Sequence, residues 1–94
     1  MRSIAVTTQY KKDLKAARKK NLQESKLDEI VKLLACDEQL PIRCCDHALH
    51  GKFEGFRECH IEPDWLLIYR KEDTTQIQLL LLVRTGTHAK LFGI

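Results

Sequence analysis

The sequence predicts an α+β domain in the order β-α-α-β-β-β, in which a helical hairpin packs on one face of a mostly antiparallel sheet. Two observations support this class. Apolar residues in the first half of the chain recur with a helical period, whereas the second half contains short, nearly continuous apolar runs. The chain of 94 residues has room for one domain, which we expect to span residues 1–94.

The first half begins with a strand and a helix. Residues 2–7, RSIAVT, alternate in part between polar and apolar side chains, which is typical of a strand. From Thr8 the period changes, and Tyr10, Leu14 and Ala17 fall on one stripe of a helix.

A second helix follows after a short joint. Its apolar residues are spaced at i, i+3, i+4 and i+7: Leu27, Ile30, Val31 and Leu34. Asn21, followed three residues later by Glu24, resembles an N-cap with its reciprocal acid. The two helices are expected to form an antiparallel hairpin whose apolar stripes need a sheet to cover them.

The second half is expected to supply the other strands. Residues 41–52 have no clean period and are expected to form a loop. FRECHI (56–61) and WLLIYR (65–70) are expected strands joined by a tight turn at Pro63, and QIQLLLLVR (76–84) is the next strand. The nearly continuous apolar runs of the last two predict central strands that are buried on at least one face.

Strand counting places ionisable side chains at one end of this sheet. A hairpin turning at the EPD sequence sets His60 roughly opposite Leu66. A second hairpin, turning near Asp73, sets Arg84 roughly level with residue 62. The side chains expected to gather at this end are His60, Asp64, Trp65, Arg84 and, four residues further on, His88.

The histidines indicate a chemistry for this end of the sheet. All four lie in the second half of the chain: His47, His50, His60 and His88. Histidine is the side chain best suited to proton transfer near neutral pH. A cluster of His and Asp with an Arg suits acid–base cleavage of a phosphodiester, because the Arg stabilises the charge added to phosphorus. RNA supplies its own nucleophile, the 2′-hydroxyl, so no metal or cofactor is required.

Two aromatic residues near this cluster have different expected environments. Trp65 opens an apolar strand, which favours the core over a surface that stacks on a base. Phe92 lies close to the C-terminus and has little core left to join. We therefore expect Phe92 either to fold back onto the sheet or to contact a ligand.

Positive charge is concentrated near the N-terminus, although the net charge of the chain is only +3. Residues 1–20 contain seven Lys or Arg and one Asp, whereas residues 21–40 contain two Lys and five acids. The basic residues of the first helix suit a polyanion or an acidic protein: Lys11, Lys12, Lys15, Arg18, Lys19 and Lys20. A solvated helix face, with cations placed where the helix dipole favours them, explains the same composition.

Metal binding is the main chemical alternative. Thiols and imidazoles are offered by Cys44, Cys45, His47, His50, Cys59 and His60. The adjacent Cys-Cys and the H-x-x-H lack the paired C-x₂-C spacing of structural zinc sites, so no metal is expected. Because no apolar stretch is long enough to span a membrane and no signal-peptide core is present, we expect a cytoplasmic protein with reduced cysteines.

Three blocks of sequence resemble the YafQ branch of the RelE/ParE toxin superfamily. They are D-H-x-L-x-G, G-x-R-x-x-H-[IV]-x-P-D-W-[IL]-L-I-Y and R-x-G-[TS]-H-x-x-L-F, in this order within residues 46–93. The first half is similar through its β-α-α pattern and its basic first helix. The resemblance implies a RelE-like fold and a bacterial type II toxin, an mRNA interferase that cuts messenger RNA on the translating ribosome. It also implies a cognate antitoxin, similar to DinJ.

The resemblance implies roles for individual residues. The functional positions of the family correspond to His47, His60, Asp64, Arg84, His88 and Phe92, together with Trp65. By this analogy His88 is the general acid. The base is His60 or His47, helped by Asp64.

The remaining implied roles concern binding. Arg84 is expected to stabilise the pentavalent phosphate, and Phe92 to stack on a base or position it. The basic first helix is expected to face ribosomal RNA phosphates. Operator DNA is expected to be contacted only through the antitoxin complex.

A toxin of this fold that acts only by binding is the alternative, for example a gyrase inhibitor like ParE or an inactive co-repressor. The retained His, Asp and Arg residues argue against it, because a pure binder needs no acid–base pair.

Overall fold

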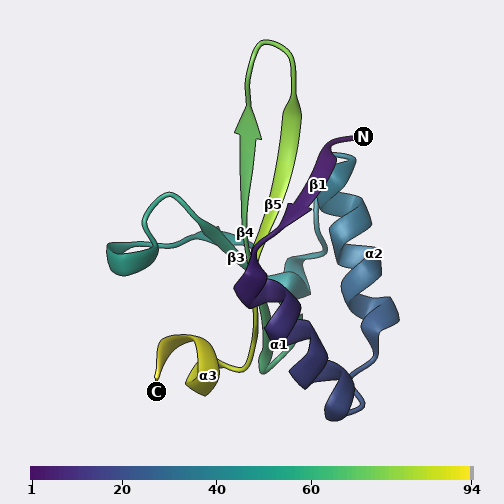
Figure 1. Ribbon diagram of the computed structural model, residues 1–94, viewed down its shortest axis with the longest axis vertical. Coiled ribbons are helices and arrows are strands. Elements are labelled where there is room, and N and C mark those ends of the chain that lie inside the picture. Colours follow the sequence, from purple (N-terminus) through teal and green to yellow (C-terminus); the bar gives the residue numbers. More distant parts are fainter. Residues whose placement is uncertain (94) are drawn as a thin grey trace.

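A five-stranded sheet organises the chain (Figure 1). The computed structural model describes residues 1–93. The strands lie in the order β1-β5-β4-β3-β2, with β1 parallel to β5 and the other neighbouring pairs antiparallel. The helices and strands are β1 (Ser3–Val6), α1 (Thr8–Lys19), α2 (Glu24–Ala35), β2 (His47–Ala48), β3 (Arg57–Glu62), β4 (Trp65–Asp73), β5 (Gln78–Gly86) and α3 (His88–Phe92). The predicted α+β class is confirmed, and β2 and α3 are additional elements.

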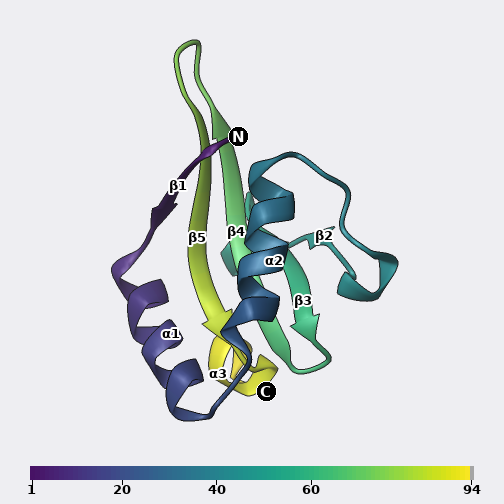
Figure 2. The same ribbon diagram turned by 90° about the vertical axis from the view of Figure 1, so that its right-hand side faces the viewer.

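The two long helices, α1 and α2, cover one face of the sheet, while α3 lies on the other (Figures 1 and 2). Side chains alternate along β4, so Trp65, Leu67 and Tyr69 pack in the core shared with α1 and α2. Leu66 and Ile68 point to the opposite face and pack with α3. This burial on both faces explains why the β4 sequence reads as a continuous apolar run. None of the helices in residues 1–93 is both long and apolar enough to cross a membrane.

The predicted cap of α2 was wrong. The N-cap of α2 is Gln23, whose side chain makes no capping hydrogen bond. Asn21 instead has a φ of 58°, a left-handed conformation that asparagine tolerates just after a helix. Glu24 accepts two hydrogen bonds from Arg18, at 2.7 and 2.9 Å, and so fastens the corner between α1 and α2.

The segment 41–52, predicted to be a loop, contains the strand β2. His47 pairs with Glu58 and Ala48 with Arg57, and a short 3₁₀ turn lies on either side of the strand. The prediction was wrong here because two residues are too few to show an alternating pattern. The strand places His47 at the edge of the sheet, opposite Glu58.

The register of one hairpin also differs from the prediction. In the β3–β4 hairpin His60 lies opposite Leu66, as predicted. Arg84 on β5, however, is level with Glu58 of β3 rather than with residue 62. The reason is that β4 and β5 continue to pair through polar residues beyond their apolar runs, so the turn falls later in the chain.

Candidate active site

Three elements bring imidazole and carboxylate groups to the face of the sheet on which α3 lies. His47 on β2 pairs with Glu58 on β3, and His60 is two residues further along β3. Residues directly opposite in an antiparallel pair, and residues two apart on one strand, point to the same face. His88 joins them from the first position of α3, so segments far apart in sequence form one cluster.

Glu58 lies between two imidazoles. Its Oε1 is 3.5 Å from Nε2 of His60 and 3.7 Å from Nε2 of His47, and the residue is only 4% exposed. A nearly buried carboxylate stabilises a positive charge on a neighbouring imidazole. Glu58 is not among the site residues predicted from the sequence. The signal that indicates it is its position two residues before His60 on the same strand.

His88 forms a separate pair with Asp64, which lies in the β3–β4 turn. The Oδ1 of Asp64 is 2.7 Å from Nδ1 of His88 and accepts the backbone N–H of His88 at 3.0 Å. These backbone and side-chain hydrogen bonds hold the pKa of Asp64 below its usual value. With Nδ1 engaged by a carboxylate, Nε2 is the nitrogen of His88 that is left for a substrate. Asp64 was expected to assist His60 or His47, but its contact is with His88.

The two histidines His60 and His88 lie side by side. Their ring centroids are 5.5 Å apart and their planes are nearly perpendicular. Each ring has its own carboxylate, Glu58 for His60 and Asp64 for His88. A pair of imidazoles with separate carboxylate partners can serve as base and acid for one substrate placed across them.

Arg84 is held by a buried carboxylate on α1. Its Nε and Nη2 each donate to Asp13 at 3.0 Å, and the backbone N–H of Thr85 donates to the same carboxylate at 3.2 Å. Burial by itself would raise the pKa of Asp13. The hydrogen bonds from Arg84, Gln9 and Thr85 outweigh burial and keep this pKa below its usual value.

Arg84 also lines a cavity of about 520 Å³ between α3 and the 3₁₀ turn at residues 51–53. Its lining includes His50, Lys52, Phe53, Lys90 and Phe92. The rings of Phe53 and Phe92 meet edge to face, with centroids 5.6 Å apart. Cationic and aromatic groups in one cavity suit a nucleotide, whose phosphate and base they can bind separately. Helix α3 connects this cavity to the histidine cluster, since it begins at His88 and ends at Phe92.

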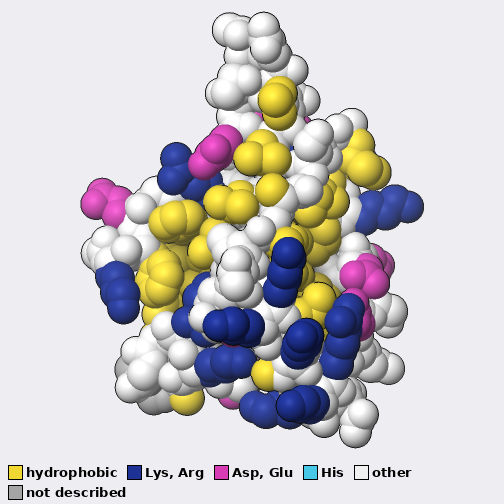
Figure 3. Space-filling view, in the orientation of Figure 1, with side chains coloured by type: hydrophobic (Ala, Val, Ile, Leu, Met, Phe, Trp, Pro, Cys, Tyr) yellow, Lys and Arg dark blue, Asp and Glu magenta, His cyan; other side chains and the backbone are white. Residues whose placement is uncertain are grey.

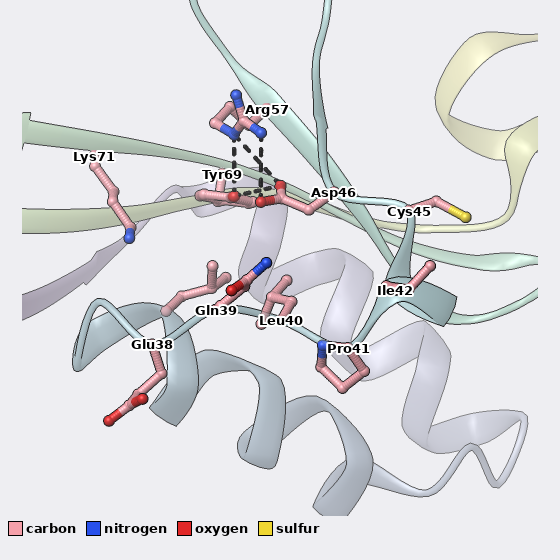
Figure 4. A pocket seen from close by; sticks show the side chains of 11 residues that line it. Glu38, Gln39, Leu40, Pro41, Ile42, Cys45, Asp46, Arg57, Tyr69 and Lys71 are labelled. Atoms are coloured by element: carbon pink, nitrogen blue, oxygen red, sulfur yellow. Dashed lines mark hydrogen bonds and ion pairs between the residues drawn. The ribbon is translucent and has the colours of Figure 1, made fainter.

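The strand that carries His47 is tied to the centre of the sheet. The hydroxyl of Tyr69 donates to Oδ1 of Asp46 at 2.6 Å, and Arg57 lies within 3.4 Å of both residues. Burial raises the pKa of Tyr69, which keeps this hydroxyl protonated as a donor. Figure 4 shows the three side chains joined along one wall of a second cavity, of about 420 Å³. This network fixes the short β2 strand at the residue directly before His47.

Trp65 lies in the core. It is 2% exposed and donates its Nε1–H to Oγ1 of Thr85 at 2.9 Å. Its ring therefore presents no surface to a base.

The basic residues of the first helix form an exposed surface. In Figure 3 Lys and Arg side chains gather in the lower half of the view, over α1. We call the residues Lys11, Lys12, Lys15, Lys19 and Lys20 the basic face; all are exposed. Within residues 1–93 none of these lysines has an ion-pair partner, whereas Arg18 is paired with Glu24.

One group of side chains in residues 1–93 is close enough to hold a metal ion. Glu58, His60 and His88 each offer a ligand atom, and these atoms lie within 4.8 Å of one another. Imidazole and carboxylate ligands suit zinc and related transition metals. No cysteine belongs to the group. Cys44 and Cys59 are buried, and burial raises the pKa of both thiols.

The fold and the site together define a small α+β domain equipped for acid–base chemistry on a negatively charged substrate. Comparison with known proteins supplies the family. A family model described as "Bacterial toxin of type II toxin-antitoxin system, YafQ" matches residues 2–93, and the chain belongs to this family. The family predicted from the three sequence blocks is therefore confirmed.

Individual relatives agree with this assignment. The mRNA interferase toxin YafQ of Escherichia coli K12 is 44% identical over 93 residues, covering 98% of this chain and 97% of that protein. The toxin in the crystal structure of the E. coli DinJ–YafQ toxin–antitoxin complex has a TM-score of 0.86 and 44% identity, with 98% of each chain covered. A metal-bound toxin from Helicobacter pylori has a TM-score of 0.88 and 38% identity, covering 98% of this chain and 100% of that one.

Proposed function

We propose that this toxin is an mRNA interferase that cleaves messenger RNA on the ribosome by acid–base catalysis without a metal. The observation that carries the proposal is the convergence of two histidine–carboxylate pairs, His60 with Glu58 and His88 with Asp64, at 5.5 Å between the imidazole rings. The family and the curated name of the E. coli relative, an mRNA interferase toxin, support the same activity.

In this mechanism the RNA 2′-hydroxyl is the nucleophile. His60 or His47, each with Nε2 near Glu58, removes its proton, and the 2′-oxygen attacks the adjacent phosphorus. The bond from phosphorus to the 5′-oxygen breaks, and Nε2 of His88 donates a proton to that leaving oxygen. The products are a 2′,3′-cyclic phosphate and a 5′-hydroxyl.

The neighbouring cavity binds the substrate around the scissile bond. Arg84 stabilises the negative charge that builds up on the phosphate oxygens in the transition state. Phe92, whose ring already packs edge to face against Phe53, stacks on a base or positions it.

The partners follow from the family and from the charge of the surface. A cognate antitoxin of the DinJ kind silences the toxin, as supported by the DinJ complex of the E. coli relative. The basic face of α1 contacts ribosomal RNA phosphates, which position a protein without specifying sequence. The toxin acts in the cytoplasm, and it reaches operator DNA only as part of the antitoxin complex.

The test is cleavage of translated messenger RNA by the purified toxin. Cleavage is expected to persist in EDTA and to fall by about 10²- to 10⁴-fold in His88→Ala. Ala89→Ser, on the exposed side of the same helix, is the control and is expected to cleave normally. Cleavage by His88→Ala at the wild-type rate contradicts the assignment of His88. Intact messenger RNA together with inhibited DNA supercoiling would instead favour a gyrase inhibitor.

A further inference from the structure

Asp13 is the single acid among residues 1–20, and its side chain has no exposed surface. A carboxylate is costly to bury unless hydrogen bonds and opposite charges compensate. Asp13 has both: the two donors of Arg84, the backbone N–H of Thr85 and Nε2 of Gln9 at 3.1 Å. Nζ of Lys90 on α3 lies 3.5 Å from the same carboxylate.

The contacts leave one edge of the Arg84 guanidinium unused. Its Nε and Nη2 point to Asp13, whereas Nη1 makes no hydrogen bond to any other of residues 1–93. The fork of a guanidinium is planar, so a bidentate carboxylate on one edge fixes the direction of the other. Arg84 lines the cavity that also contains Phe92 and Lys90. The Nη1 edge of Arg84 is therefore available to an anion bound in this cavity.

Two elements meet at Asp13. Figures 1 and 2 show α1 beside the end of β5, at the point where the chain turns into α3. The carboxylate of α1 thus holds one cation from β5, Arg84, and one from α3, Lys90. A buried ion pair often stabilises a fold no more than an apolar replacement would. Stability alone therefore does not explain why Asp13 is paired with Arg84.

We propose that Asp13 is a positioning residue for catalysis: it orients Arg84 toward the phosphate of RNA bound in the cavity. The inference rests on the proposed function, because it needs a phosphate at Arg84. Asp13 itself touches no substrate. It acts by removing the freedom of the guanidinium to turn away before the transition state forms.

The experiment compares single-turnover cleavage of messenger RNA on saturating ribosomes by the wild type and five variants: Asp13→Asn, Arg84→Ala, Arg84→Lys, the double variant of Asp13→Asn with Arg84→Ala, and Asp28→Asn. The last removes an exposed carboxylate from α2 and is the matched control. Asp13→Asn is expected to lower the maximal rate by about ten-fold or more, with a change below about two-fold in the ribosome concentration that gives half the maximal rate.

The double variant distinguishes positioning from a general loss of structure. If Asp13 acts through Arg84, Asp13→Asn is expected to change the rate by less than about two-fold once Arg84 is already alanine. An equal loss in both backgrounds, or a wild-type rate in Asp13→Asn, overturns the inference. If thermal unfolding shows that Asp13→Asn does not fold, the Arg84→Lys variant tests whether the oriented guanidinium is needed. It keeps the charge but lacks the fork, so it is expected to lose about ten-fold in rate, and a wild-type rate overturns the inference.

A measurement on the free toxin separates this inference from the proposed function. The Nε–H of Arg84, observed by ¹⁵N NMR, is expected to exchange slowly with water in the wild type and rapidly in Asp13→Asn. If the toxin leaves RNA intact but the Nε–H exchange still differs between the wild type and Asp13→Asn, the proposed function is contradicted. The orientation of Arg84 by Asp13 then still holds. Rapid exchange in the wild type overturns the orientation, whatever the activity.

Discussion

At the scale of single residues, the imidazoles of the site contact two carboxylates, one buried and one exposed. Glu58 is almost fully buried beside His60 and His47, whereas Asp64 is exposed in a turn and holds His88 through Nδ1. A general base and a general acid need different protonation states before reaction. The two imidazoles His60 and His88 contact separate carboxylates, so one carboxylate can be substituted without removing the contact of the other.

The same geometry predicts inhibition by a transition metal. Zn²⁺ bound by Glu58, His60 and His88 would hold two of the imidazoles proposed to transfer protons, so it is expected to bind and to stop cleavage. Calorimetry should show one Zn²⁺ per toxin, with binding about ten-fold weaker in Glu58→Gln because one ligand is lost. Removal of metal with EDTA should restore the full rate. Faster cleavage with Zn²⁺ than in EDTA would contradict both this prediction and the metal-independent mechanism.

At the scale of elements, the N-terminal strand β1 is fastened by ion pairs. Arg2, just before β1, is 2.8 Å from Asp37 after α2 and 2.6 Å from Asp73 at the end of β4. Lys71 is also 2.8 Å from Asp37. Hydrogen bonds from Lys71 and Arg2 lower the pKa of Asp37 to about 2. The carboxylate therefore joins three segments that are far apart in sequence.

This pKa predicts an acid-sensitive contribution to stability. A carboxyl group whose pKa is lower in the folded than in the unfolded state, where it is about 3.9, stabilises the fold above that value. The contribution is lost as the pH falls from about 4 to about 2. In thermal unfolding, Asp37→Asn should be less stable than the wild type at pH 6, and the difference should shrink toward pH 2. Glu38→Gln, the neighbouring exposed acid, is the control. A difference that stays constant with pH would contradict the assignment.

Elements with a repeating pattern could be predicted from the sequence, and those without one could not. The stripes of α1 and α2 and the apolar run of β4 are long enough for their period to be recognised. The two-residue strand β2 has no period, and the α2 cap depended on a backbone conformation at Asn21 that local sequence does not determine.

The same limit applies to the site. Strand counting predicts that His60, Asp64, Arg84 and His88 gather at one end of the sheet, and all four lie in the recognisable sequence blocks. The structure brings His60, Asp64 and His88 together, whereas Arg84 is level with Glu58. Glu58 acquires its place only through pairing with β2 and β4. The Asp13 contact to Arg84 joins residues 71 positions apart, which no local pattern can indicate.

At the scale of the whole molecule, helix α1 presents two different sets of side chains on opposite sides. Its inward side contributes Tyr10 and Ala17 to the core and Asp13 to Arg84. Its outward side is the basic face (Figure 3). A ribosome bound to this face would therefore contact the same helix that holds Arg84. The two proposed roles, ribosome binding by the basic face and orientation of Arg84 by Asp13, would use different side chains of α1, so substitutions can test them separately.

Substitutions in the basic face are expected to weaken binding of the ribosome without changing catalysis. Lys12, Lys15 and Lys19 are exposed and spaced by three and four residues, so they form one stripe on α1. Replacing all three by Gln should raise the KM for ribosomes and leave kcat unchanged, because phosphate contacts supply affinity rather than chemistry. A salt series should show a shallower dependence of log KM on log salt, by roughly 0.7 per lost phosphate contact. Lys32→Gln, on the exposed side of α2, is the control for general charge. A fall in kcat at unchanged KM, or an equal loss in the control, would show that the basic face does not bind the ribosome.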